Sequence, residues 1–214
     1  MSPAVALRPN SNQPVLALVE KLFSAKSVHR QPTPVLRPIR VQDRAMQGQF
    51  FAELSDEARF DRFMGATSGV SPSMLRVLSD VLPRQHEAVM AVTSVDGNRT
   101  MVAEARYVRD ADNPANAEFA ITVGDQWQRQ GLARRLMKAI EQSACENGIE
   151  KLIGITLKSN HAMITLANRL GYRSCLHPDD ARATRLIKHL VPECNQYLSG
   201  QRAPFGFDVH ATAA

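Results

Sequence analysis

The chain has 214 residues, of which 44% are hydrophobic and 22% are charged, values typical of one globular domain with tails. Its formal net charge of +5 comes from residues 1–40, which hold six basic residues and one acidic residue, whereas the rest of the chain holds twenty of each. Because a nucleic-acid-binding domain is basic on its folded surface, this distribution argues against a nucleic acid as the partner.

The sequence also limits the compartment and the use of metals. No apolar run reaches the ~20 residues that a membrane-spanning helix needs, and the N-terminus lacks the ordered regions of a secretory signal. The cysteines are widely spaced and form no Cys-x-x-Cys pair, which predicts neither a disulfide framework nor a structural zinc site. They are Cys145, Cys175 and Cys194. We therefore expect a cytoplasmic protein with reduced thiols, no membrane partner and no metal.

Residues 1–34 are expected to form a basic N-terminal extension, because they contain five of the twelve prolines. Within it, apolar residues recur at helical spacing between Val15 and Phe23. This spacing predicts a short amphipathic helix that docks on the body of the protein or on a partner. Residues 35–191 form the main predicted domain, and residues 192–214 are expected to be a C-terminal tail.

The first half of the main domain predicts a strand, two helices and three further strands. The first strand carries Pro38, which favours the edge of a sheet. Ser55 and Ser71 are candidate helix N-caps, and Asp96 and Gly97 indicate a hairpin turn. The expected elements are a strand at 35–41, helices at 43–64 and 71–82, and strands at 88–95, 100–108 and 117–123.

The second half predicts a long amphipathic helix, a strand, a second helix and a last strand. Gly148 and Gly171 are expected to end the two helices, since glycine tolerates the positive φ common after a helix. The expected elements are helices at 131–147 and 161–170 and strands at 151–157 and 184–190, with a short additional strand after Gly171. Three antiparallel strands that lead into a β-α-β unit predict an α+β domain on a mixed sheet.

The junction between the strand at 117–123 and the helix that starts near Gly131 carries the strongest chemical signal. A helix N-terminus presents unpaired N–H groups and partial positive charge, so it favours anions. Gly131 lets a ligand approach the backbone closely, and Ala133 keeps the first turn thin. Basic residues surround this start: Arg129, Arg134, Arg135 and Lys138. The pattern predicts a polyphosphate site, with a solvated basic helix start as the alternative.

Residues 128–133, Gln-Arg-Gln-Gly-Leu-Ala, resemble the Gln/Arg-x-x-Gly-x-Gly/Ala signature of the GNAT superfamily of N-acetyltransferases. Downstream, the segment from Asn160 to Tyr172 resembles the superfamily's motif of Asn-x-x-Ala followed by Leu and Gly-Phe/Tyr. The resemblance spans roughly residues 35–190. It implies the superfamily's fold, a mostly antiparallel mixed sheet between helices in three layers, and it implies acetyl-CoA as the co-substrate.

Shorter segments resemble, within this superfamily, the acetyltransferase domain of bacterial protein-lysine acetyltransferases. They are Arg37-Pro-Ile-Arg40, Ala105-Arg-Tyr107, Ala117-Glu-Phe-Ala120 and Gly154-Ile-Thr156. This resemblance implies that the acceptor of the acetyl group is an amine, and favours an amine on a protein.

The resemblance also implies which residues bind acetyl-CoA. The loop and the start of the helix hold its pyrophosphate, the end of the preceding strand offers backbone N–H groups to the thioester carbonyl, and Asn160 hydrogen-bonds the pantetheine arm. A helix N-cap role for Asn160 is equally compatible. The implied residues are Ile121, Thr122, Val123, Gln128, Arg129, Gln130, Gly131, Leu132, Ala133, Arg134 and Asn160.

An acceptor lysine, with a pKa of ~10.4, must lose a proton before it attacks a thioester, so the site needs a base. Glu118 lies in the strand before the loop, where apolar neighbours are expected to raise its pKa. In the resembling family the glutamate of this strand is the general base, often acting through water. Glu104 is a second candidate, but it shares a strand face with Arg106, which favours an ion pair. Ala167 stands where many GNAT enzymes carry a tyrosine general acid, so no acid is assigned.

Other functions stay open on the sequence alone. A small amine, such as a polyamine, is an alternative acceptor. A non-catalytic acetyl-CoA sensor is a second alternative, although a sensor has no need of the base Glu118. A DNA-binding role would rest on the N-terminal extension alone and would show a steep salt dependence. Formation of a homodimer is compatible with each of these functions.

Overall fold

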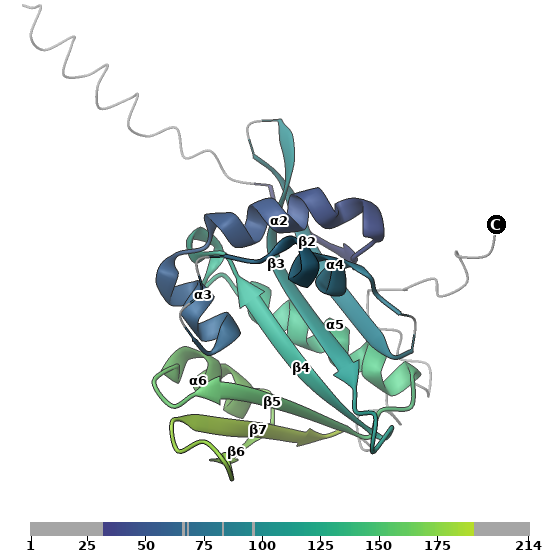
Figure 1. Cartoon of the computed structure of the whole chain (residues 1–214), viewed down its shortest axis with the longest axis vertical. Coiled ribbons are helices and arrows are strands. Elements are labelled where there is room, and N and C mark those ends of the chain that lie inside the picture. Colours follow the sequence, from purple (N-terminus) through teal and green to yellow (C-terminus); the bar gives the residue numbers. More distant parts are fainter. Residues whose placement is uncertain (1–31, 66, 68, 83, 96, 191–214) are drawn as a thin grey trace, which may run out of the picture. The chain divides into compact units, whose positions relative to one another are not determined.

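The computed structural model describes residues 32–190 with the exception of residues 66, 68, 83 and 96. The helix expected near the N-terminus and the expected C-terminal tail lie outside the described residues. The described part forms a seven-stranded mixed sheet with helices on both faces (Figure 1). The predicted α+β class and the three-layer arrangement are therefore confirmed.

The strands follow the order β1-β2-β3-β4-β5-β7-β6 across the sheet. Neighbours are antiparallel except for β4 and β5, which are parallel. Pro38 lies in edge strand β1, as predicted, because proline has no N–H to donate to a second neighbour. Val95 pairs with Asn98 across the predicted hairpin. The strands are β1 (Val35–Pro38), β2 (His86–Val95), β3 (Asn98–Arg109), β4 (Asn116–Val123), β5 (Lys151–Leu157), β6 (Arg173–Leu176) and β7 (Ala183–His189).

Two apolar clusters, one on each face of the sheet, hold the helices. Successive side chains of a strand point to opposite faces, so Met90 packs in one cluster with Phe51, while Val89 packs in the other with Leu136. Helices α2 (Arg44–Glu53), α3 (Asp56–Phe63) and α4 (Pro72–Ser79) contribute to the first cluster, and α5 (Leu132–Glu146) and α6 (His161–Arg169) to the second. Two short 3-10 turns, η1 (Val41–Asp43) and η2 (Asp125–Trp127), complete the described elements.

The single helix predicted at 43–64 is wrong, because the structure has two helices there, α2 and α3. Ser55 separates them: its hydroxyl accepts a hydrogen bond from the backbone N–H of Ala58 at 3.2 Å and begins α3. The predicted N-cap role of Ser55 is therefore confirmed, although the apolar spacing that continues across it favoured a single helix. Ser71 begins α4 in the same way, with Met74 N–H as the donor at 3.1 Å.

The cysteines differ from the expectation of three reduced thiols. Cys145 of α5 takes part in a disulfide, so the expectation is wrong for this residue. Cys175 is a free cysteine. The spacing of cysteines along a chain does not determine which of them approach within the ~4.4–6.8 Å Cα separation that a disulfide needs.

A buried cluster of charged and polar side chains fixes α2 and α3 on the sheet. Glu104 of β3, only 1% exposed, accepts hydrogen bonds from Arg106 Nη2 and from Gln47 Nε2, both at 2.7 Å, and lies 3.6 Å from Arg62 Nη2. Burial alone raises the pKa of Glu104, but the charges of Arg106 and Arg62 outweigh it and hold the pKa below its ordinary value. Burial and the charge of Arg106 lower the pKa of His86 to about 4. Glu104 therefore forms the ion pair with Arg106 that was predicted from their shared strand face.

Replacing Glu104 by glutamine is expected to lower the free energy of unfolding by about 3 kcal/mol or more, because Arg62 and Arg106 would be left as uncompensated buried charges. Urea unfolding measures this change. Glu150→Gln, at an exposed glutamate, is the control and should change the free energy by less than about 0.5 kcal/mol. Equal effects of the two substitutions would contradict the structural role of Glu104.

Candidate active site

The site begins where the parallel strands β4 and β5 part. Their pairing covers only Asn116–Phe119 of β4 and Lys151–Gly154 of β5, although both strands continue. β5 stays paired with β7 on its other edge, and β4 stays paired with β3. The backbone of residues 120–123 therefore has no β5 partner, and its polar groups on that edge are left for a ligand.

Phe119 sits at the point where the strands part. A Cβ atom placed on Gly154 would lie 2.4 Å from Cζ of Phe119, so the ring can lie against β5 only because this residue is glycine. The ring also packs against Tyr172, with 5.2 Å between the two centroids. Beyond this contact the gap between β4 and β5 widens into a cavity of about 890 Å³. Phe119 and Gly154 both line this cavity.

The cavity reaches the N-terminus of α5, where Gly131 is the N-cap residue. Gly131 has a φ of 79°, and no atom lies within 4 Å of the position that its Cβ would occupy. It has no side chain to cap the helix, so the first N–H groups are left for a ligand. Arg129 and Arg134 line the same cavity. This end is therefore built to receive an anion.

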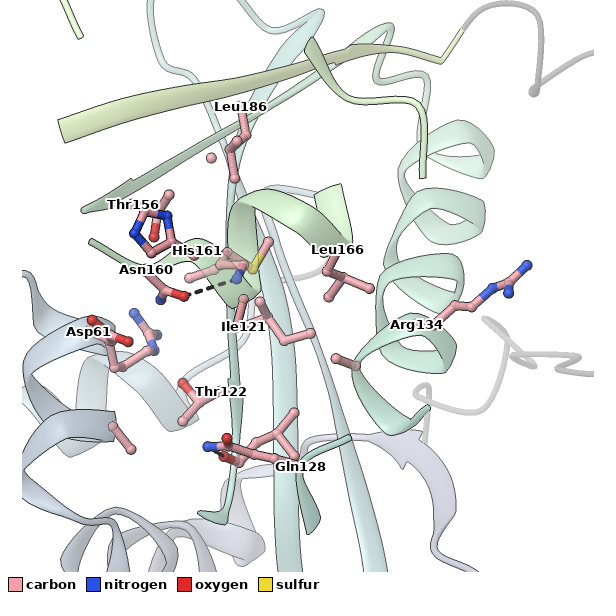
Figure 2. A pocket seen from close by; sticks show the side chains of 18 of the residues that line it. Asp61, Ile121, Thr122, Gln128, Arg134, Thr156, Asn160, His161, Leu166 and Leu186 are labelled. Carbon is pink, nitrogen blue, oxygen red and sulfur yellow. Dashed lines mark hydrogen bonds between the residues drawn. The ribbon is translucent and has the colours of Figure 1, made fainter. Parts of the chain in front are cut away.

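Most of the predicted binding residues come together around the cavity (Figure 2). Gln130 and Leu132 do not line it. The side-chain amide of Gln130 donates to the backbone oxygen of Gln126 at 2.8 Å, and the side chain of Leu132 is 4% exposed within the apolar core. The predicted residues that line the cavity are Ile121, Thr122, Val123, Gln128, Arg129, Gly131, Ala133, Arg134 and Asn160.

Asn160 begins α6 at the cavity wall. Its Oδ1 accepts a hydrogen bond from the backbone N–H of Met163 at 2.9 Å, drawn as a dashed line in Figure 2. The N-cap role is therefore confirmed. The side-chain nitrogen of Asn160 lies at the same wall and is a donor that a bound ligand can use.

Glu118, the predicted base, lies on β4 but is not among the residues that line the cavity. Its side chain is exposed, so the apolar surroundings suggested by its sequence neighbours are not found. The reason is the alternation of the strand: the apolar side chains of Ala117 and Phe119 are buried on the opposite face. On its own face Glu118 is close enough to Arg62 of α3 for their charges to interact.

Two carboxylates of α3, which the sequence did not single out, line the cavity: Glu57 and Asp61. Burial and the negative charge of Glu57 raise the pKa of Asp61 above its ordinary value. The available sequence signal was a pair of acidic residues four positions apart, which places both on one helix face. Whether that face meets the site depends on how α3 packs, so the signal was not decisive.

A hydrogen-bonded contact fixes the start of α3 against the loop between β4 and α5. The carboxylate of Asp125 accepts hydrogen bonds from the backbone N–H of Ser55 at 3.1 Å and from its hydroxyl at 2.7 Å. Burial raises the pKa of Asp125, but these hydrogen bonds outweigh it and lower the pKa overall. The acidic face of α3 is thereby held beside the loop that leads to Gly131.

In the described part of the chain, no helix is long and apolar enough to cross a membrane. Within the same residues, no group of three or more His, Cys, Asp or Glu side chains is arranged to hold a metal ion.

A sheet that parts beside an open helix N-terminus is a site for a ligand with an anionic end and a long arm that runs between strands. Residues 51–172 match the model of the Acetyltransferase (GNAT) family. The chain belongs to this family and is an acyl-CoA-dependent N-acetyltransferase that uses acetyl-CoA as its co-substrate. The predicted family, fold and co-substrate are thus confirmed.

Several relatives share this domain. Acetyltransferase PA5475 of Pseudomonas aeruginosa is 32% identical over 157 residues, which are 73% of this chain and 83% of the relative. Acetyltransferase Pat of Mycolicibacterium smegmatis is 32% identical over 138 residues, which are 64% of this chain and only 40% of that longer relative. Among solved structures, the GNAT domain of S. lividans PAT superposes with a TM-score of 0.66 at 26% identity, over 73% of this chain and 90% of that one. The fold is also that of yncA from Salmonella typhimurium, solved with its cofactor acetyl-CoA, at a TM-score of 0.57 and 15% identity over 73% of this chain and 94% of that one.

Gly131→Asp is expected to abolish acetyl-CoA binding, because it puts bulk and negative charge at the anion-binding end of the cavity. Gly148→Asp is a matched control: Gly148 follows the other end of α5, has a φ of 74°, and likewise has no atom within 4 Å of its Cβ position. The two variants share the same backbone strain, so calorimetric titration with acetyl-CoA isolates the effect of the site. If the Gly131 variant binds acetyl-CoA with the affinity of the wild type, the pyrophosphate does not bind at the start of α5.

Proposed function

We propose that the chain transfers the acetyl group of acetyl-CoA to the side-chain amine of a lysine in a protein. The assignment of acetyl transfer is supported above all by the separation of β4 from β5 beside the open N-terminus of α5. The choice of a protein acceptor is supported by the similarity to Acetyltransferase Pat and to the GNAT domain of S. lividans PAT.

In this proposal the pyrophosphate of acetyl-CoA lies at the N-terminus of α5, with Arg129 and Arg134 as countercharges. The pantetheine arm runs along the unpaired edge of β4, near Asn160. Backbone N–H groups between Ile121 and Val123 donate to the thioester carbonyl oxygen and stabilise the negative charge that develops there during attack.

The reaction is a direct displacement with both substrates bound. The neutral amine nitrogen attacks the carbonyl carbon of the thioester, a C–N bond forms, and the C–S bond breaks as CoA leaves as a thiolate. One proton leaves the ammonium group before attack and goes to a base. The second leaves the nitrogen as the amide forms and neutralises the thiolate, so no separate acid is needed at Ala167.

Glu118 is the base in this proposal. Because its side chain is exposed and does not line the cavity, it takes the proton through an intervening water. Its position supports this assignment, because it lies on β4, whose following residues line the cavity, and this strand contacts α3.

Glu118→Gln is expected to lower kcat more than ~ten-fold, within the ~10²–10⁴-fold range of general base catalysis, while acetyl-CoA affinity changes little. Steady-state rates together with calorimetric titration separate the two quantities. Glu150→Gln, again at an exposed glutamate, is the control and should leave kcat unchanged. If the Glu118 variant has the kcat of the wild type, Glu118 is not the general base.

The acceptor class can be determined with labelled acetyl-CoA. The purified protein is incubated in parallel with a dialysed pool of cytoplasmic proteins and with the small-molecule filtrate of the same extract. Label in discrete protein bands is the expected result. Label confined to the filtrate would establish a small amine as the acceptor instead. No label in either sample, together with measurable acetyl-CoA binding, would favour a sensor. A cytoplasmic location and a homodimer stay predictions from the sequence.

A further inference from the structure

The acidic side of the cavity carries charges that the protein itself does not neutralise. Asp61 is partly buried and, among the residues that the structure describes, makes no hydrogen bond and no ion pair. Its neighbour Arg62 is turned to Glu104, 3.6 Å away. The carboxylate of Glu57, one helical turn earlier, repels the negative charge of Asp61.

The charge of Asp61 does not serve the stability of α3, whereas Glu57 lies in the first turn, where the helix dipole favours a negative charge. Two carboxylates at positions i and i+4 destabilise a helix, and Asp61 lies in the last turn of α3, where the helix dipole is unfavourable for a negative charge. A cation bound between the two side chains relieves both penalties. The same helix contributes Phe60 to the cavity, an exposed ring against which an aliphatic stem can pack.

Strand β4 contributes a buried hydroxyl group to the same cavity, and this feature is independent of the charges on α3. Thr122 is only 6% exposed, and its hydroxyl oxygen is buried with no hydrogen-bond partner among the described residues. A buried hydroxyl without a partner is costly unless a ligand supplies one. Figure 2 shows Thr122 projecting from β4 on the side where α3 carries Asp61, and both residues line the same cavity.

We propose that Asp61, with Glu57 beside it and the Thr122 hydroxyl opposite, binds the ammonium group of the acceptor before acetyl transfer. A protonated primary amine offers three donors, which match the two carboxylates and the hydroxyl. The basic residues Arg129 and Arg134 belong to the α5 side of the cavity, so the anionic and cationic substrates are recognised by separate walls. This inference rests on the proposed function and names the residues that select a cationic amine for it.

The test uses the full chain and measures initial rates with acetyl-CoA and two acceptors, a short lysine peptide and spermidine. Asp61→Asn is expected to raise the KM of the accepted amine at least ~ten-fold, as the loss of a charge-assisted hydrogen bond does, with little change in kcat or in acetyl-CoA affinity. Asp61→Glu should restore part of the affinity. Glu57→Gln should raise KM less, because Glu57 is more exposed. Asp112→Asn, at an exposed loop carboxylate outside the cavity, is the matched control and should change nothing.

Urea unfolding of the same variants separates substrate binding from a structural role. Asp61→Asn should leave the free protein as stable as the wild type or more stable, since it removes a repulsive charge. An unchanged KM, or a loss of stability that accounts for the loss of activity, would overturn the docking role. A fall in kcat at constant KM would make Asp61 part of the chemical step instead. If the wild type binds acetyl-CoA but acetylates neither amine, the proposed function itself fails and the docking role fails with it.

Discussion

The contact between the Phe119 ring and the backbone of Gly154 is the constraint on which the site depends. It lies at the last paired residues of two parallel strands, and only a residue without a side chain can face the ring there. Beyond it the strands diverge, so the sheet interior, which is normally closed by a continuous ladder of hydrogen bonds, offers free backbone groups to a ligand. Each lost pair leaves backbone polar groups that need another partner, which a bound ligand can supply.

The second requirement is that α3 lies over the opened strand, and buried polar contacts secure it. Arg62 of α3 reaches the buried carboxylate of Glu104, and Asp125 holds the N-cap of α3 to the loop that precedes α5. Arg62 and Asp125 also line the cavity, but the carboxylates of Glu104 and Asp125 are already engaged by donors of the protein. These contacts place the acidic residues of α3 and the basic residues at the start of α5 around one cavity.

Several features of the site could be predicted because they are local. The run from Gln128 to Ala133 encodes the open helix start through Gly131, whose positive φ needs no information from elsewhere in the chain. The caps at Ser71 and Asn160 follow from the hydrogen bonds of single side chains to nearby backbone. The cap at Ser55 belongs to the same class, but the division into two helices was not predicted, because α2 and α3 both bury apolar side chains in the same cluster.

The sequence by itself determined most of the order of the elements, the open start of α5 at Gly131 and the membership of the acetyltransferase family, since each depends on short motifs and local patterns along the chain. Only the tertiary structure decided that Glu118 is exposed, that Glu104 is held in a buried ion cluster, and that Asp61 and Thr122 line the same cavity. The physical reason is that burial, charge pairing and the meeting of two walls depend on how α3 packs on β4. That packing is set by contacts between residues far apart in the chain, which no local pattern specifies.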